Sequence, residues 1–284
     1  MTDQDEMELP RAIALAWGVA AAPQRGPKRE MSVERIVEAA VAIADDGGLP
    51  AVSMAAVAAR FDMTPTALYR YVSAKDDLVL LMFENGIGLP PAAVPGATWR
   101  EALTAWAHAQ LAVMIEHPWL LDVPIPGPPV TPNGVAWSEA GVAALASTGL
   151  TGGECLAAIL AVNGQMRWQA VLVRANSTDD TDERALLAAL ITPDEFPAYH
   201  AALFADGPAA DFSLGLAYLL DGIEAAAAGR TTPIAAPAPG NEPAMSDKKY
   251  REAVKNRRGK ERELRGALRE ERQALREARE RNGG

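Results

Sequence analysis

Residues 53–75 carry side chains that can form hydrogen bonds and ion pairs on one face of a helix. Thr66, Tyr69 and Arg70 recur at a spacing of three and four, so a helix places them on the same side, and Leu68 then points inward. Hydroxyl, phenol and guanidinium groups bond phosphate oxygens and base edges in the DNA grooves. The spacing therefore predicts a nucleic-acid-binding face, although an ordinary helical hairpin with polar outward residues has the same periodicity.

Two short helices joined by a tight turn are expected to position this face. Ser53 can cap the first helix, because a serine oxygen accepts one of the unpaired backbone N–H groups there. The turn falls at Asp62, and Asp tolerates the left-handed backbone conformation better than most residues. Thr64 can cap the second helix, in which Pro65 occupies the first position. This is the layout of a helix-turn-helix, whose second helix enters the major groove.

Further helices are expected around this pair, and no stretch shows the alternating pattern of a strand. A helix begins after Ser32 and ends at Gly47, and it holds the next two helices at a fixed angle. Ser73 and Asp76 have the spacing of a capping box, which would open a helix that runs to about Asn85. The remaining predicted helices are 99–116, 135–147, 154–175, 182–191, 194–204 and 212–229. The sequence predicts an all-α fold.

The segment TALYRYVSAKDDL resembles the recognition helix and the following helix start of TetR family transcriptional regulators. The matching positions are Leu68, Tyr69, Tyr71, Lys75, Asp76 and Leu78, and the resemblance covers about residues 32–84. Asp62 departs from the pattern, which usually has Gly there. The resemblance implies a three-helix DNA-binding domain with a helix-turn-helix, followed by a helical ligand-binding and dimerisation domain.

Candidate DNA-binding residues follow from the pattern and the resemblance together. Arg70 is the expected base-reading residue, and Tyr69, Tyr71 and Lys75 are expected to contact phosphates. A proline-rich basic arm before the first domain can reach the backbone or the minor groove, although it also fits a solvated linker. The full candidate set is Arg25, Lys28, Arg29, Ser53, Thr64, Pro65, Thr66, Ala67, Tyr69, Arg70, Tyr71 and Lys75.

The charge distribution limits how this chain can bind DNA. The net charge is −10, which argues against binding by overall positive charge. Residues 246–284 contain 14 basic and 8 acidic residues, a net of +6, so residues 1–245 carry −16. Residues 25–84 themselves contain 7 basic and 9 acidic residues. Binding must therefore depend on a few cations placed on one face.

The second half contains no catalytic motif, nucleotide loop or paired cysteines. The three histidines lack the spacing of metal ligands, so we predict neither an enzyme nor a cofactor or metal. Large apolar residues mixed with a few polar ones are typical of a ligand pocket between helices, and core packing explains the same composition. The candidates are Trp106, His117, Trp119, Trp137, Asn163, Met166 and Trp168. The resemblance implies that a small organic inducer binds here.

The predicted domains are an N-terminal segment with the basic arm (1–31), a DNA-binding domain (32–85), a ligand-binding and dimerisation domain (97–230), a linker (231–245) and a charged tail (246–284). Small residues on helix 212–229 favour close helix packing, either in a homodimer with helix 154–175 or within one chain. The tail is expected to be solvated and partly helical, and its charge also allows nonspecific contact with DNA.

No apolar run is long enough to span a membrane, the N-terminus lacks the order of a signal peptide, and Cys155 has no intramolecular partner. A cytoplasmic protein without membrane attachment is expected. The hypothesis is a ligand-responsive transcriptional regulator, a repressor released from a palindromic double-stranded DNA operator by a small molecule. The alternative is a helical small-molecule-binding protein or enzyme in which the hairpin is incidental.

Overall fold

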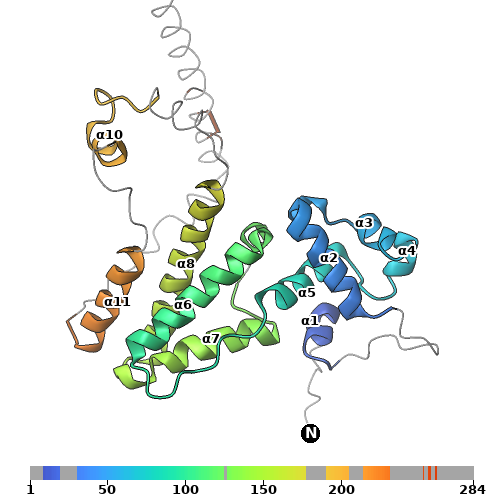
Figure 1. The fold of residues 1–284 in the computed structure, drawn as a ribbon, viewed down its shortest axis with the longest axis horizontal. Coiled ribbons are helices and arrows are strands. Elements are labelled where there is room, and N and C mark those ends of the chain that lie inside the picture. The colour runs from blue at the N-terminus through green and yellow to red at the C-terminus, as the bar shows by residue number, and fades with distance from the viewer. Residues whose placement is uncertain are drawn as a thin grey trace, which may run out of the picture. The chain divides into compact units, whose positions relative to one another are not determined.

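The computed structural model describes residues 9–19, 31–124, 127–176, 190–204 and 214–230, and the single positions 252, 255, 256 and 260. The chain divides into two compact units, Met1–Thr231 and Thr232–Gly284, and the elements named below all belong to the first. In the described ranges every regular element is helical (Figure 1). The all-α prediction is confirmed. None of these helices is both long and apolar enough to cross a lipid bilayer.

The N-terminal elements surround the predicted helix-turn-helix. They are α1 (Arg11–Ala16), α2 (Val33–Gly47), η1 (Leu49–Ala51), α3 (Met54–Ala59), α4 (Pro65–Leu68) and α5 (Lys75–Ile87). The helix start predicted from a capping box at Ser73 is wrong, because Ala74 is the N-cap and no side chain caps α5. A capping box usually ends in Glu or Gln, and the shorter Asp76 does not complete one here.

The remaining elements are α6 (Trp99–Glu116), η2 (Pro118–Asp122), α7 (Pro132–Ala144), η3 (Ala146–Thr148), α8 (Gly152–Asn176), α10 (Pro197–Phe204) and α11 (Leu214–Ala227). α6 has the predicted bounds, and Thr98 and Glu101 form a capping box at its start. α7 begins three residues before its predicted start. The helix predicted at 182–191 lies almost entirely outside the described residues.

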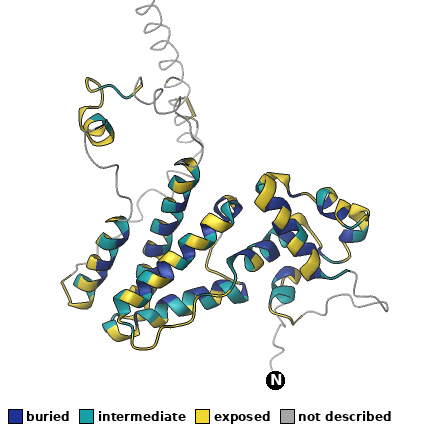
Figure 2. Cartoon of the chain, viewed as in Figure 1, coloured by how far each residue is buried: buried dark blue, intermediate teal, exposed yellow. Residues whose placement is uncertain are grey.

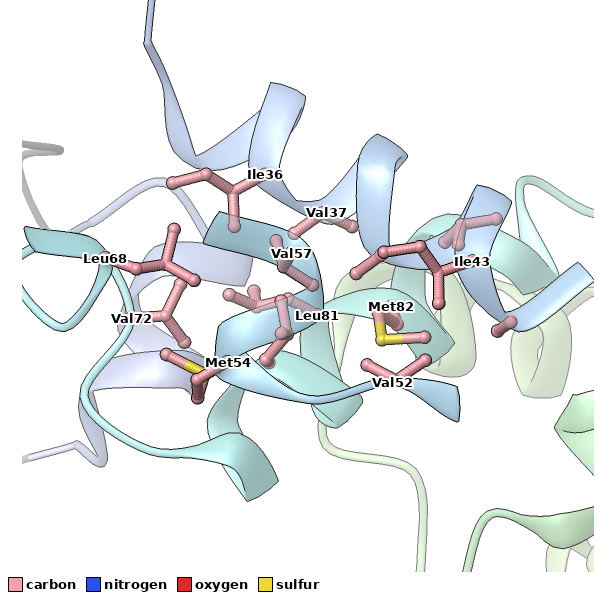
Figure 3. Close-up of a cluster of buried hydrophobic side chains, with 14 of the residues drawn as sticks. Ile36, Val37, Ile43, Val52, Met54, Val57, Leu68, Val72, Leu81 and Met82 are labelled. Atoms are coloured by element: carbon pink, nitrogen blue, oxygen red, sulfur yellow. The ribbon is translucent and has the colours of Figure 1, made fainter. Parts of the chain in front are cut away.

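Two buried hydrophobic clusters organise these helices, and Figure 2 shows the buried sides of the helices in dark blue. The first joins α2, α3, α4 and α5, and its labelled members include Ile36, Val57, Leu68 and Met82 (Figure 3). Trp119 from η2 also belongs to this first cluster. The second cluster joins α6, α7, α8 and α11.

Candidate DNA-binding and ligand-binding sites

The helix-turn-helix is fixed by the residues that the sequence singled out for its caps and turn. Ser53 Oγ accepts from the backbone N–H of Ala56 at 3.0 Å. Thr64 Oγ1 accepts from the backbone N–H of Ala67 at 3.3 Å, and Pro65 opens α4. Asp62 has a φ of 53°, the left-handed conformation predicted for the turn.

Burial separates the two sides of α4 and of residues 69–72, which follow it, as the periodicity predicted. Leu68 and Val72 are fully buried in the first cluster, which holds α4 against α2 and α3. Thr66, Tyr69 and Arg70 are exposed, and Tyr69 retains 47 % of its accessible surface. The exposed face therefore offers a hydroxyl, a phenol and a guanidinium to a ligand, which is the chemistry that phosphates and base edges accept.

The other candidate DNA-binding residues have more varied surroundings. Ser53, Thr64, Pro65 and Lys75 are exposed, with Ser53 and Thr64 already used as helix caps, and Ala67 and Tyr71 are half-buried. Lys75 is the first residue of α5, where Asp76 and Asp77 also lie in the first turn. Arg25, Lys28 and Arg29 lie outside the described residues.

One contact to the chain just after α4 could not be predicted from the sequence. The Arg11 guanidinium on α1 donates through Nη2 to the backbone carbonyl of Arg70 at 3.1 Å. The two residues are 59 positions apart, so no local pattern could indicate the contact. Arg11 supports the end of the predicted recognition helix from a segment that precedes the resembling region.

Three of the candidate ligand-binding residues lie in the second cluster, and a fourth, Asn163, is half-buried on α8. Trp106, Trp137 and Met166 are buried there. Trp106 Nε1 donates to the Trp137 carbonyl at 2.9 Å, and Trp137 Nε1 donates to the Gly88 carbonyl at 3.0 Å. Asn163 Nδ2 donates to Oε1 of buried Gln110 across α6 and α8. One polar amide pair thus lies on α6 and α8, the helices that also carry apolar residues of the second cluster.

His117 and Trp119 have a different environment from that predicted. Trp119 is only 1 % exposed and is buried with the DNA-binding helices. Its Nε1 donates to Asp45 Oδ1 on α2 at 2.7 Å, and His117 Nδ1 lies 2.8 Å from the same oxygen. The assignment of these two residues to a pocket of the second domain needs correction, because both bind the helix that precedes the helix-turn-helix.

Trp168 does not enclose a cavity with the other candidates, because it is 60 % exposed on α8. A surface hollow of about 550 Å³ is lined by Thr98, Arg100, Glu101, Thr104, Ala105 and His108. None of the seven candidates lines this hollow. The composition of the second half indicates large apolar and aromatic residues. It does not distinguish those that lie in the second cluster from Trp119, which bonds α2, or from Trp168, which is on the surface.

Two arginines of α8 hold η2 in place. Arg167 donates to the carbonyls of Leu120 and Leu121, and burial lowers the pKa of its guanidinium. Arg174 Nη1 donates to the Pro118 carbonyl at 3.2 Å and pairs with Asp122 at 3.0 Å. η2, which carries Trp119 to Asp45, is thereby tied to the long helix of the second cluster.

Comparison with known proteins identifies the two parts of the chain. Residues 36–82 match the family of bacterial regulatory proteins of the tetR type, and residues 91–227 match the tetracyclin repressor-like C-terminal domain. The HTH-type transcriptional repressor DrrR1 of Streptomyces coeruleorubidus is 35 % identical over 240 residues, which cover 78 % of this chain and 88 % of the relative. An HTH-type transcriptional regulator of Saccharopolyspora erythraea is 33 % identical over 215 residues, or 72 % and 89 % of the two chains.

The fold also matches solved structures. ActR of Streptomyces coelicolor, in a complex with actinorhodin, superposes with a TM-score of 0.60 at 24 % identity and covers 71 % of this chain and 99 % of its own. The family assignment rests on the sequence matches, which cover both the DNA-binding region and the C-terminal domain. The chain belongs to the TetR family of bacterial regulatory proteins and is a DNA-binding transcriptional regulator, not an enzyme.

Proposed function

We propose that this regulator is a repressor, which binds a palindromic operator as a homodimer and is released from it by a small organic molecule. The exposed face formed by Thr66 on α4 and by Tyr69 and Arg70 directly after it is the observation that carries the DNA-binding part. The similarity to DrrR1, which is named a repressor, supports repression over activation.

Arg70 is the proposed base reader, because a guanidinium can donate two hydrogen bonds to a guanine in the major groove. Its backbone carbonyl already accepts from Arg11, while its side chain is exposed. Tyr69, Tyr71 and Lys75 are the proposed phosphate contacts. Lys75 stands at the start of α5, where backbone N–H groups also favour a phosphate. The arm with Arg25, Lys28 and Arg29 is proposed to add backbone contacts.

The homodimer is proposed to form through α8 and α11, which pack on each other within one chain. Leu160 and Trp168 on α8 are 71 % and 60 % exposed, and Tyr218 on α11 is 68 % exposed. Large exposed apolar residues on adjacent elements are typical of an interface. A two-fold axis between the copies would present two recognition helices to two half-sites, so a palindromic operator follows.

The inducer is proposed to bind among Trp106, Trp137, Asn163 and Met166, beside the Gln110–Asn163 amide pair. Apolar walls with a few oriented polar groups are typical of small-molecule sites. ActR, which shares the fold, has been crystallised with actinorhodin, so actinorhodin is a suitable first probe. Binding is expected to favour a conformation whose recognition helices no longer match the groove spacing.

The test combines a gel shift with light scattering. The purified full chain is titrated against the DNA upstream of its own gene and against a scrambled fragment at the same salt concentration, because phosphate contacts make affinity salt-dependent. A dimer that prefers the upstream fragment supports the proposal. A folded dimer that binds both fragments equally would overturn operator recognition, and a folded monomer that binds specifically would overturn the dimer.

The inducer site is tested separately by tryptophan fluorescence with actinorhodin. Quenching that is reduced in Trp106→Phe, together with release of the upstream fragment, supports the proposed site and an aromatic ligand. If actinorhodin releases the upstream fragment but quenches the Trp106→Phe variant as strongly as the wild type, the ligand binds elsewhere.

A further inference from the structure

Helix α1 precedes both regions that match the family, yet it is packed into the DNA-binding part. Ala12 is 2 % exposed, Leu15 and Ala16 pack against the first cluster, and α1 contacts α5. Its end is sharply defined. Gly18 has a φ of 65°, Val19 N donates to the Ala14 carbonyl at 2.9 Å, and Gly18 N donates to the Leu15 carbonyl at 3.0 Å. These two bonds form a Schellman motif, which fixes the direction of Trp17.

The two ends of α1 are bonded to distant parts of the chain. Arg11 Nη2 donates at 3.1 Å to the carbonyl of Arg70, two residues after the end of α4. Trp17 Nε1 donates to the Val130 carbonyl at 2.9 Å. Val130 lies just before α7 and is followed by buried Thr131. The same helix thus contacts the recognition helix at one end and the approach to the second cluster at the other.

The recognition helix depends on outside contacts more than a long helix would. α4 contains only four residues, and an isolated helix of that length is not stable in water. The chain just after α4 is held from outside as well, because Arg11 donates to the Arg70 carbonyl there. The start of α7 is also held, because Glu84 Oε1 accepts from Asn133 N at 2.8 Å. Both attachment points of α1 are therefore ordered.

We propose that α1 is a strap between the segment before α7 and the recognition helix, with Arg11 and Trp17 as its two positioning residues. This inference rests on the proposed function and adds a second route to DNA-binding control. When the segment around Val130 moves, the Trp17 contact transfers the movement through α1 to the Arg70 carbonyl. The strap holds α4 in its DNA-binding position while both contacts are intact.

Because the two contacts act in series, cutting either one should have the same effect as cutting both. The variants are Arg11→Ala, Trp17→Phe, which keeps an aromatic ring but loses the N–H donor, and their combination. A lost hydrogen bond of typical strength corresponds to an about fivefold loss of affinity. Each single variant and the double variant are expected to lose about fivefold in binding to the upstream fragment. Arg11→Lys, which keeps a donor, should restore part of the loss.

Hydrogen exchange in the free protein gives a readout that does not depend on DNA. The amides of Tyr71 and Val72, which donate to the Leu68 carbonyl, should exchange faster in Trp17→Phe although Trp17 bonds a different segment. The amide of His117, which donates to the Val113 carbonyl, should be unchanged. Val19→Ala, at an exposed residue beside Trp17, is the control and should have no effect.

Multiplying losses in the double variant would show two independent contacts and would overturn the strap. An effect of Arg11→Ala without any effect of Trp17→Phe on affinity or on exchange at Tyr71 and Val72 would also overturn it. If the wild-type chain does not prefer its upstream fragment, the proposed function fails, and the exchange measurement alone still decides the strap.

Discussion

Gly86 on α5 faces Trp119 of η2. Adding a methyl group at Gly86 tests how rigidly η2 packs against the DNA-binding helices. An alanine Cβ at this position would lie 3.0 Å from Cη2 and 3.0 Å from Cζ2 of the Trp119 ring. The ring cannot easily give way, because it is 1 % exposed and its Nε1 is bonded to Asp45 at 2.7 Å.

Two opposing contributions set the expected size of the Gly86→Ala effect. Replacing Gly by Ala inside a helix stabilises by at most about 1 kcal/mol. Overpacking a filled core costs about 1–3 kcal/mol. The expected net result is a loss of about 1 kcal/mol in the free energy of unfolding, which lowers Tm by about 2–4 °C for a chain of this size. Thermal unfolding followed by circular dichroism measures the change.

Two further variants isolate the ring as the cause. Gly153→Ala is the matched control, because a Cβ at that helical glycine meets nothing within 4 Å, and it should leave Tm unchanged or raise it. In a Trp119→Leu background the clash is removed, so Gly86→Ala should become stabilising. A rise in Tm from Gly86→Ala in the wild-type chain, or an equal change in both backgrounds, would refute the idea of a rigid Trp119 seat.

Four further changes test other parts of the structure. Arg70→Ala should weaken binding to the upstream fragment about 10- to 100-fold while light scattering still shows a dimer; unchanged discrimination against scrambled DNA would exclude base reading. Asp62→Gly should raise Tm, since it relieves about 1 kcal/mol of left-handed strain at φ 53°, and a lower Tm would mean that the Asp side chain stabilises the turn. Leu160→Glu should dissociate the dimer, whereas Leu89→Glu, similarly exposed but outside α8 and α11, should not; intact dimers in both would place the interface elsewhere. The backbone N–H and hydroxyl of Thr98 hold the pKa of Glu101 below its ordinary 4.5. The ionised Glu101 therefore stabilises the fold above pH 4.5, and this stabilisation is lost as the pH falls through the lowered pKa. The Tm difference between wild type and Glu101→Gln should shrink below about pH 4.5, and a constant difference would contradict the assignment.

Local features of the helix-turn-helix were predictable because they depend on neighbours in the sequence. Caps at Ser53 and Thr64 and the left-handed turn at Asp62 each involve residues within about three positions. The same logic failed at Ser73, where Asp76 is too short to complete the motif. At Thr98 the motif is complete, because Glu101 has the longer side chain. Local patterns therefore predict a cap only when the length of the side chain is considered as well as its spacing.

The environments of the tryptophans could not be predicted from the sequence. Trp106, Trp119 and Trp168 have the same chemistry, but one lies in the second cluster, one in the first and one on the surface of α8. The two buried environments depend on partners far along the chain, such as Asp45, which is 74 positions from Trp119. Neither periodicity nor composition contains that information.

The polar contacts at η2 give the Asp45 carboxylate an importance that its position on α2 does not suggest. Asp45 Oδ1 binds both His117 at the end of α6 and Trp119 in η2. Arg167 and Arg174 hold the carbonyls of the same short helix from α8. A displacement of α6 or α8 therefore reaches α2 through the packing of Trp119 in the first cluster and through the Asp45 carboxylate, whose hydrogen bonds are directional and are weakened steeply by misalignment. Such a contact favours two distinct arrangements over a gradual deformation, which is the property that a switch between DNA-bound and released forms requires.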